Sequence, residues 1–558
     1  MTQSKFLSAV LFAAAVVIAT PAANGAAVVK VLGAGSSAMW QTAAIGAFNQ
    51  LAGSGAQHYT VKGTCTTNPN CAQIHDSRSA SILPEGGNLW VVWNAAQTSV
   101  WAYISVDSVV GNRAFFAVPK TTLQVDPETE AGVPSSQTNL ISSNLWGADA
   151  AVLPSAIYTA LNNATITTAF TDIRPEDAKF ASCRTLNELN TTTYAGLGYG
   201  TGTTCTTLIG TQIFSTVSSA VANPVNFNIK GTDPFTSEAI PAYTTVDVGA
   251  APIVFIVNRS NPNGLGYGGA TPVITNLTLP IAQTLWNGTE CDTNAFLAAG
   301  PPTDVPVTVF QREPMSGTMN TTEFTTFRCG KTTGGCPITG NSENNSQEKG
   351  VNPTLGGAND PLNLPCTAGG GSRKRGVGTG DLVNSGVFPT TDSIGYTFWS
   401  FGNVSKLAGS ANYGYLTLSG VDPIQAAYTN GELPACVSST GVSGVCPATP
   451  GTSFPNLRNG SYTAWSVLRV VTNASGVNLT NTKLLVTAIQ DNVNTTVPDF
   501  VPFVATGGDP GLKLYRSHYL QSGVSPNNGL SGQKEAGGDV GGCIETKGTA
   551  PGILSCHQ

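Results

Sequence analysis

The sequence predicts an α/β protein built of two lobes. Residues 28–32 are a β-branched run that leads through a Gly/Ser turn at 33–37 into an Ala-rich stretch at 38–51. This order of strand, turn and helix is one unit of an α/β fold. A second, strongly apolar strand is expected at 251–257. Because the chain has 558 residues, two or more lobes are expected rather than one core.

Further elements are expected in order along the chain. Strands are predicted at 89–93, 101–106 and 393–398, and helices at 155–163 and 279–286. Residues 462–471 and 483–489 are periodic and are expected to form regular elements, which are not assigned as helix or strand. The stretch 119–147 is polar and rich in Pro, Ser and Asn, so we expect a loop there.

The N-terminus has the pattern of a secretory signal peptide over residues 1–25. Lys5 supplies the positive charge, 6–20 is apolar, and small residues at Ala23 and Gly25 fit a cleavage site. The apolar run is too short to span a bilayer comfortably. We therefore expect an exported protein, periplasmic or extracellular, that does not span the membrane.

The twelve cysteines are an even number, which favours disulfides in an exported chain. Spacing alone suggests five local pairs, which leaves Cys291 to pair with Cys366. The local pairs are Cys65–Cys71, Cys183–Cys205, Cys329–Cys336, Cys436–Cys446 and Cys543–Cys556. Zinc is the competing interpretation, but there is no Cys-x-x-Cys and the four His are scattered. No metal and no other cofactor is expected.

Charge limits the classes of partner. Charged residues make up only 10% of the chain, and the net charge is −6. The one basic cluster is Arg373-Lys374-Arg375, so nucleic acid is not an expected partner. Since the overall field does not attract anions, an anionic ligand would need local donors.

Such donors occur together at 309–328. Arg312 follows an apolar run, and Ser316, Gly317 and Thr318 come four residues later at the expected start of a helix. Unpaired N–H groups at a helix start bind anions, and an arginine adds a planar pair of donors. A helix cap beside a surface arginine explains the same residues, and this segment alone leaves both interpretations open.

Five blocks of sequence occur in the order of a known family. They are Gly33 to Ser37, residues 168–175, residues 251–258, Arg312 to Thr318, and Ser393 to Tyr396. With them the chain resembles the phosphate-binding proteins of ABC importers, in the type II periplasmic binding protein superfamily. The spacing Arg-x-x-x-Ser-Gly-Thr is the most specific single block. The resemblance covers about residues 27–500 and implies a two-lobe α/β fold with disulfide-rich insertions.

The resemblance also implies a set of ligand-binding residues for phosphate. They are Ser36, Ser37, Ser155, Asp172, Arg312, Ser316, Gly317 and Thr318. Ser155 is the nearest counterpart of the family's serine-rich second loop, and Asp107-Ser108 is its rival. The chain departs from the family at Ala38, where an aromatic residue is usual, and at Pro314, where a second acidic residue is usual.

Asp172 would give the site its selectivity. An ionised carboxylate only accepts hydrogen bonds, and phosphate near neutral pH has a proton to donate whereas sulfate has none. An unpaired buried acceptor facing sulfate would cost about 1–3 kcal/mol. Two local alternatives stay open. Asp172 could instead cap a helix starting near Pro175, and Asp107 could form a turn with a local ion pair to Arg113.

The same resemblance implies how the chain is divided. Lobe one would comprise 26–250 and 390–500, with insertions near 55–150 and 183–230. Lobe two would comprise 251–389, with an insertion at 330–385. Composition, independently of the resemblance, predicts a poorly packed tail rich in Gly, Pro and Ser at 501–558.

Two classes of function follow. The first is an exported solute-binding protein that binds phosphate or a similar oxyanion between its lobes and delivers it to an ABC permease. The second is a secreted or surface structural or adhesion protein that kept the fold without transport. An enzyme is not expected, because no Gly-x-Ser-x-Gly turn occurs and no His is suitably placed for a hydrolytic triad.

Overall fold

A computed structural model gives the structure of the protein. It describes residues 26–62, 72–80, 82, 84–125, 139–175, 178–179, 211–216, 219–224, 227–267, 274–286, 288–296, 304–312, 316–322, 325–326, 364–366, 368–376, 378–404, 407, 410–428, 450–493, 499–516, 544–546 and 553–555.

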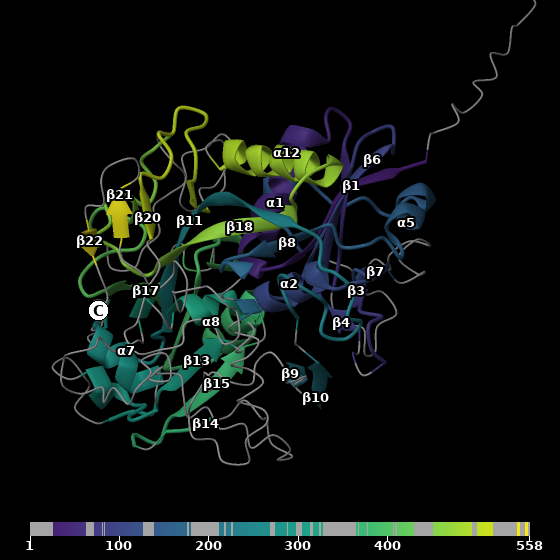
Figure 1. The fold of residues 1–558 in the computed structure, drawn as a ribbon. Helices are drawn as coiled ribbons and strands as arrows, with labels where there is room; N and C mark the ends of the chain where they lie inside the picture. Colours follow the sequence, from purple (N-terminus) through teal and green to yellow (C-terminus); the bar gives the residue numbers. More distant parts are fainter. Residues whose placement is uncertain are drawn as a thin grey trace, which may run out of the picture.

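The described elements confirm the predicted α/β fold, which is built around one large mixed sheet (Figure 1). From edge to edge the strands are β14 (Leu364–Pro365), β15 (Ser372–Gly376), β13 (Thr308–Arg312), β16 (Ser393–Phe398), β11 (Tyr243–Asn258), β18 (Trp465–Asn473), β8 (Thr168–Thr171), β1 (Val28–Gly35), β6 (Ser99–Ser105), β5 (Asn88–Trp93) and β2 (Gln57–Val61). Three short strands join beside this path, namely β12 (Asn276–Leu277), β17 (Tyr413–Leu418) and β19 (Val501–Pro502).

Helices and smaller sheets surround the large sheet. The longer helices are α1 (Trp40–Gly46), α2 (Ser108–Phe116), α5 (Ser155–Leu161), α7 (Leu279–Trp286), α8 (Gly317–Thr322) and α12 (Val477–Asn492). Shorter helical turns are η1 (Ser37–Met39), η2 (Ala47–Leu51), α4 (Ser143–Trp146), η3 (Thr293–Phe296), α9 (Gly378–Gly380), η6 (Asp381–Val387), α10 (Phe401–Val404) and α11 (Pro455–Arg458). The small sheets pair β3 (Ala72–His75) with β4 (Glu85–Gly86) and β7 (Thr122–Val125), β9 (Thr211–Thr216) with β10 (Ser219–Pro224), and β21 (Ile544–Thr546) with β20 (Leu514–Arg516) and β22 (Ile553–Ser555).

Strand β11 joins two halves of the large sheet. Its residues 243–252 pair with β18, and its residues 253–258 pair with β16. We call β18, β8, β1, β6, β5 and β2 the first half, and β16, β13, β15 and β14 the second half. The strand order therefore places the predicted anion segment after β13 in one half and the Gly/Ser turn after β1 in the other.

The first half is covered by helices on both faces, as the alternation of its buried side chains shows. Trp90 and Val92 of β5 lie in the apolar cluster that contains α1 and α12, whereas Leu89 and Val91 lie in the cluster with α2 and α5. Successive strand residues point to opposite faces, so both faces bury apolar side chains. Each fully buried side chain of this size stabilises the fold by about 1.5–3 kcal/mol.

Two predicted insertions contribute to the large sheet. The segment near 55–150 supplies β2, β5 and β6 together with α2, and the segment at 330–385 supplies β14 and β15. Strands β5 and β6 match those predicted at 89–93 and 101–106, whereas β2, β14 and β15 were not predicted; all five are stabilised by pairing within the large sheet. Of the predicted insertion at 183–230, the structure describes residues 211–216, 219–224 and 227–230.

The predicted tail at 501–558 is packed where it begins. Strand β19 pairs with β11, Leu512 and Leu514 are buried, and Asp509 pairs with Arg458 at 2.7 Å. The Gly and Pro residues of this segment form turns between buried positions, so composition alone predicted less packing than exists.

Among the described residues one disulfide is present, the predicted pair Cys291–Cys366. The other five proposed pairs, like the predicted signal peptide at 1–25, lie outside the described residues. In the described part of the chain no helix is both long and apolar enough to cross a membrane.

Candidate anion-binding site

Three polar loops meet at one edge of the first half. Strand β1 is parallel to β6 and β8, and Gly35 at its end lies opposite Ser105 and Phe170. Since the carboxyl ends of parallel strands share an edge, the residues that follow them come together, as at the ligand sites of open α/β sheets. These residues are Ser36 and Ser37 after β1, Asp107 and Ser108 after β6, and Asp172 after β8.

Asp172 is the centre of the cluster. Its side chain is 1% exposed, the Ser108 hydroxyl donates to Oδ1, and the Thr318 hydroxyl donates to Oδ2 at 3.4 Å. The Ser466 hydroxyl donates to its backbone carbonyl at 2.8 Å. These contacts connect Asp172 to three segments that are distant in the sequence.

Burial controls the ionisation of Asp172. It raises the pKa of the Asp172 carboxyl above its ordinary value, while the hydrogen bonds from Ser108 and Ser36 and the charge of Arg312 oppose that rise. Burial also raises the pKa of the nearby Tyr103 phenol, and the charges of Asp172 and Asp107 add to the effect. The carboxylates of Asp107 and Asp172 and the guanidinium of Arg312 are therefore close enough to influence the pKa values of buried groups in this cluster.

Arg312 is the last residue of β13, and its guanidinium contributes a positive charge from the second half to this cluster. The residue is fully buried, and its Nη2 lies 2.6 Å from Asp107 Oδ1. Its Nη1 donates to Thr379 Oγ1 at 3.1 Å, and its backbone N–H donates to the Tyr396 hydroxyl at 3.3 Å. The alternative prediction of a helix cap beside a surface arginine is therefore wrong in placing Arg312 at the surface, because its side chain is buried inside the protein.

The predicted triplet at 316–318 lies against Asp172. Ser316 precedes α8, and its Oγ accepts from the Met319 N–H at 3.3 Å. A β-carbon on Gly317 would overlap Asp172 Oδ1 and would lie 2.8 Å from Ser108 Oγ. Only glycine lets the start of α8 approach the carboxylate so closely, which explains the residue type at this position.

Ser37 also contacts the second half. Its hydroxyl donates to Thr379 Oγ1 at 2.8 Å, and the Thr379 N–H lies 3.4 Å from Ser37 Oγ. Ser36 accepts at Oγ from the Ala38 N–H at 3.1 Å and caps η1. Thr379 was not predicted as a site residue, because it lies in a Gly-rich stretch that sequence reasoning assigned to an insertion.

Ser155 does not join this cluster. It is exposed at the first turn of α5, and α5 lies at the outer edge of the molecule, away from α8 (Figure 1). The rival pair Asp107-Ser108 occupies the expected place instead. The structure therefore brings together Ser36, Ser37, Asp172, Arg312, Ser316, Gly317 and Thr318, with Asp107, Ser108 and Thr379 in addition.

Asp107 has an unusual backbone conformation. Its φ is 69° and its ψ is 156°, a region that is essentially restricted to glycine. Such strain costs on the order of 1–3 kcal/mol and occurs preferentially at functional sites. The conformation turns the chain from β6 into α2 and aims the carboxylate at Arg312.

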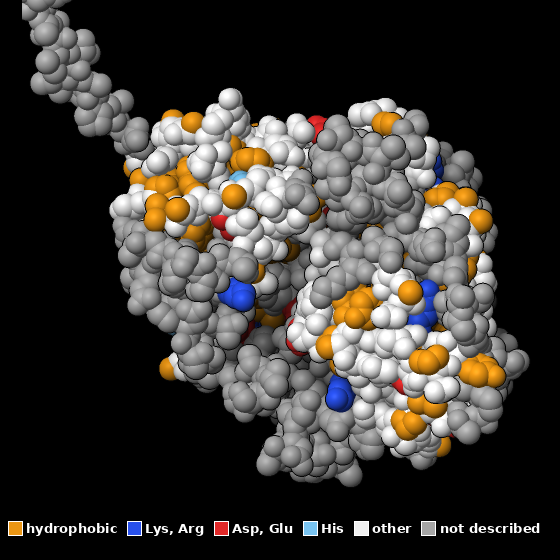
Figure 2. Space-filling view, turned by 180° about the vertical axis from the view of Figure 1, so that it is seen from behind, with side chains coloured by type: hydrophobic (Ala, Val, Ile, Leu, Met, Phe, Trp, Pro, Cys, Tyr) orange, Lys and Arg blue, Asp and Glu red, His pale blue; other side chains and the backbone are white. Residues whose placement is uncertain are grey.

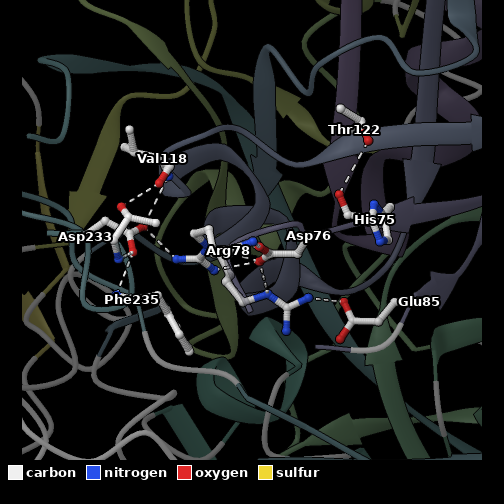
Figure 3. A network of polar contacts seen from close by, with 10 residues as sticks. His75, Asp76, Arg78, Glu85, Val118, Thr122, Asp233 and Phe235 are labelled. Atoms are coloured by element: carbon white, nitrogen blue, oxygen red, sulfur yellow. Dashed lines mark hydrogen bonds and ion pairs between the residues drawn. The ribbon is translucent and has the colours of Figure 1, made fainter. Parts of the chain in front are cut away.

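Helix α2 is fixed by a separate buried ionic network (Figure 3). Arg113 of α2 contacts Glu85 and lies 3.8 Å from Asp76, while Arg78 bonds Asp76 and Asp233 at 2.7 Å each. The predicted local pair between Asp107 and Arg113 is replaced by these contacts. The network fixes the position of α2, and Ser108 in the first turn of this helix donates a hydrogen bond to Asp172.

The surface seen from behind is hollowed between two bulky parts of the molecule, and acidic side chains are visible within the hollow (Figure 2).

Comparisons with known proteins concern the fold. No protein-family model and no curated protein sequence matches the chain. A solved high-affinity periplasmic phosphate-binding protein, PfluDING with bound phosphate, is 12% identical over 84% of this chain and 90% of its own, with a TM-score of 0.34. A phosphate binding protein from Stenotrophomonas maltophilia is 12% identical over 86% and 99%, with a TM-score of 0.32. An ABC-type phosphate transport receptor from Vibrio cholerae is 14% identical over 47% and 72%, with a TM-score of 0.23. At these identities and TM-scores, the ligands of these proteins are not assigned to this chain.

Proposed function

We propose that the protein is an exported solute-binding protein that holds an oxyanion, and phosphate in particular, between the two halves of its sheet. One observation supports this above the others. A buried guanidinium, Arg312, and a buried carboxylate, Asp172, lie in one cluster with hydroxyls contributed by both halves.

The donors suit a tetrahedral oxyanion. The guanidinium of Arg312 is planar and always charged, so it matches the paired oxygens of such an anion. Small hydroxyls at Ser37, Ser108 and Thr318 can rotate to donate to the remaining oxygens. Because these groups come from both halves, closure of the halves about β11 would complete the site around the ligand.

Asp172 gives the reason for preferring phosphate to sulfate. When ionised, its carboxylate accepts a hydrogen bond from the remaining proton of phosphate. Sulfate has no proton to donate, so its oxygens would face an acceptor. The close contact of Gly317 with this carboxylate leaves little freedom for Asp172 to turn away.

The proposal extends to transport. An exported binding protein would deliver its anion to an ABC permease, and this chain would carry no catalytic role of its own. The structural or adhesion alternative would require that the insertions fill the region between the halves. The cluster of Ser37, Asp172, Arg312 and Ser316 argues for binding instead.

Arg312→Ala tests the site. We expect the variant to lose phosphate binding in equilibrium dialysis while keeping the circular dichroism spectrum of the folded protein. Arg469→Ala is the matched control, because Arg469 of β18 pairs with Asp247 of β11 at 3.1 Å, outside the cluster. Retained phosphate affinity in Arg312→Ala, with normal affinity in Arg469→Ala, would refute the assignment.

A further inference from the structure

The ion pair between Asp107 and Arg312 connects the two halves of the sheet. Asp107 follows β6 in the first half, and Arg312 ends β13 in the second half. The side chains are 9% and 1% exposed, and their charged atoms lie 2.6 Å apart. A buried ion pair of this kind cannot persist if the halves separate.

Two hydrogen bonds donated by hydroxyl groups join the halves at the same place. Ser37 of the first half donates to Thr379 beside the second half at 2.8 Å, and Thr318 donates to Asp172 at 3.4 Å. Among the described residues, these contacts comprise one ion pair and two hydrogen bonds donated by hydroxyl groups. The ion pair is expected to dominate, because both of its partners carry a charge.

The strained backbone conformation of Asp107 also indicates that its pairing with Arg312 is important. A residue other than glycine at φ 69° and ψ 156° persists only where its surroundings enforce that conformation. Here the first turn of α2 is held by the ionic network around Arg113, and the carboxylate is held by Arg312. The sequence thus keeps a strained aspartate where a glycine would relieve the strain but lose the charge.

We propose that the Asp107–Arg312 pair holds the two halves closed before any anion binds, so that an anion enters only when this pair separates. Asp107 then acts as an internal carboxylate partner of Arg312 and controls access to the site. The effect on ligand exchange rests on the proposed oxyanion function. The closure itself does not, because it concerns the protein without ligand.

Small-angle scattering of the purified protein in phosphate-free buffer tests the closure. We expect Asp107→Asn, which keeps the shape of the side chain but removes its charge, to have a larger radius of gyration than the wild type. Asp247→Asn is the matched control, since Asp247 of β11 pairs with Arg469 of the adjacent strand β18, away from the contact between Asp107 and Arg312. Equal radii for all three proteins would overturn the proposal.

A salt series on the wild type needs no variant and covers the case in which Asp107→Asn does not fold. Separated charges are exposed to solvent, where salt stabilises them by screening. The radius of gyration is therefore expected to increase from low to high sodium chloride. A radius that stays constant over the series would also overturn the proposal.

Stopped-flow measurement of phosphate exchange distinguishes this inference from the proposed function. We expect Asp107→Asn to raise the association rate constant by about tenfold, because the pair no longer has to separate before the anion enters, and to leave the dissociation rate constant nearly unchanged. An unchanged association rate constant would refute control of access by Asp107. Absence of phosphate binding in the wild type would refute the proposed function, while the scattering results would still decide whether the pair closes the halves.

Discussion

Gly317 lies so close to the carboxylate of Asp172 that no side chain fits at position 317. A β-carbon there would overlap the carboxylate Oδ1 and would also lie 2.8 Å from Ser108 Oγ. The residue type at one position of the second half is thus dictated by a carboxylate of the first half. This relationship, rather than the triplet of small residues itself, makes the start of α8 part of the site.

Gly317→Ala is the first prediction. The added methyl group must push α8 away from Asp172, so phosphate affinity should fall by at least tenfold while the protein remains folded. Gly380→Ala is the control, because a β-carbon there meets only Asn403 Oδ1 at 3.7 Å. Calorimetric titration of both variants would measure the difference. Equal affinities would show that α8 does not need to approach the carboxylate.

Asp172→Asn should change selectivity rather than abolish binding. The asparagine amide can donate to an oxygen of sulfate, which the carboxylate cannot. We therefore expect the preference for phosphate over sulfate to shrink by about tenfold or more, corresponding to about 1–3 kcal/mol.

The control for this selectivity change is Asp422→Asn. Asp422 is also buried and its pKa is also raised, chiefly by burial, but its carboxylate contacts Tyr415 outside the cluster. The ratio of the two dissociation constants, measured by competition, should stay as in the wild type for this variant. If Asp172→Asn also keeps the wild-type ratio, Asp172 does not face the anion.

A pH dependence of stability follows from the raised pKa of Asp172. In the window between the ordinary carboxyl pKa and the raised one, the folded protein binds more protons than the unfolded chain. The stability that protonation of Asp172 supplies is thus present at low pH and lost as the pH rises through the raised pKa. Asp172→Asn lacks this loss.

The free energy of unfolding should therefore favour Asp172→Asn over the wild type increasingly as the pH rises above about 4, and the difference should level off above the raised pKa of Asp172. Urea denaturation of both proteins across this range measures the difference. A difference that does not vary with pH, or that shrinks as the pH rises, would contradict the raised pKa.

The Cys291–Cys366 disulfide should stabilise the second half. Its two cysteines are 75 residues apart, so in the chain-entropy model the bond contributes about 4 kcal/mol by restricting the unfolded chain. Cys366 lies shortly before β15, which pairs with the strand that carries Arg312. We expect the double variant Cys291→Ser, Cys366→Ser to unfold at a lower temperature in differential scanning calorimetry. An unchanged unfolding temperature would contradict this role.

Much of the fold could be predicted from local pattern. The strand beginning at Val28, the helix Leu279–Trp286 and the strand Ser393–Phe398 were all expected, and each follows the periodicity of its apolar residues. The helix expected at 38–51 is instead α1 flanked by η1 and η2. Such changes of hydrogen-bond register depend on tertiary packing that a local pattern does not contain.

The site was partly predictable for a different reason. Arg312 and the triplet after it are close in sequence, so their spacing carries a signal. Thr379 and Asp107 reach the cluster only because β15 pairs with β13 and β6 pairs with β1. Ser155 has the residue type and helix position of a ligand, yet α5 lies against β1 and β7 at another part of the sheet. Long-range strand order decided these three positions.

Calorimetric titration of the purified, oxidised protein with phosphate, with sulfate as the control, tests directly whether the cluster binds an oxyanion. We predict phosphate binding with micromolar or tighter affinity and no detectable heat with sulfate at the same concentrations. Equal binding of both anions would contradict the role of Asp172. Absence of heat with phosphate would contradict the proposal that the cluster around Arg312 is an oxyanion site.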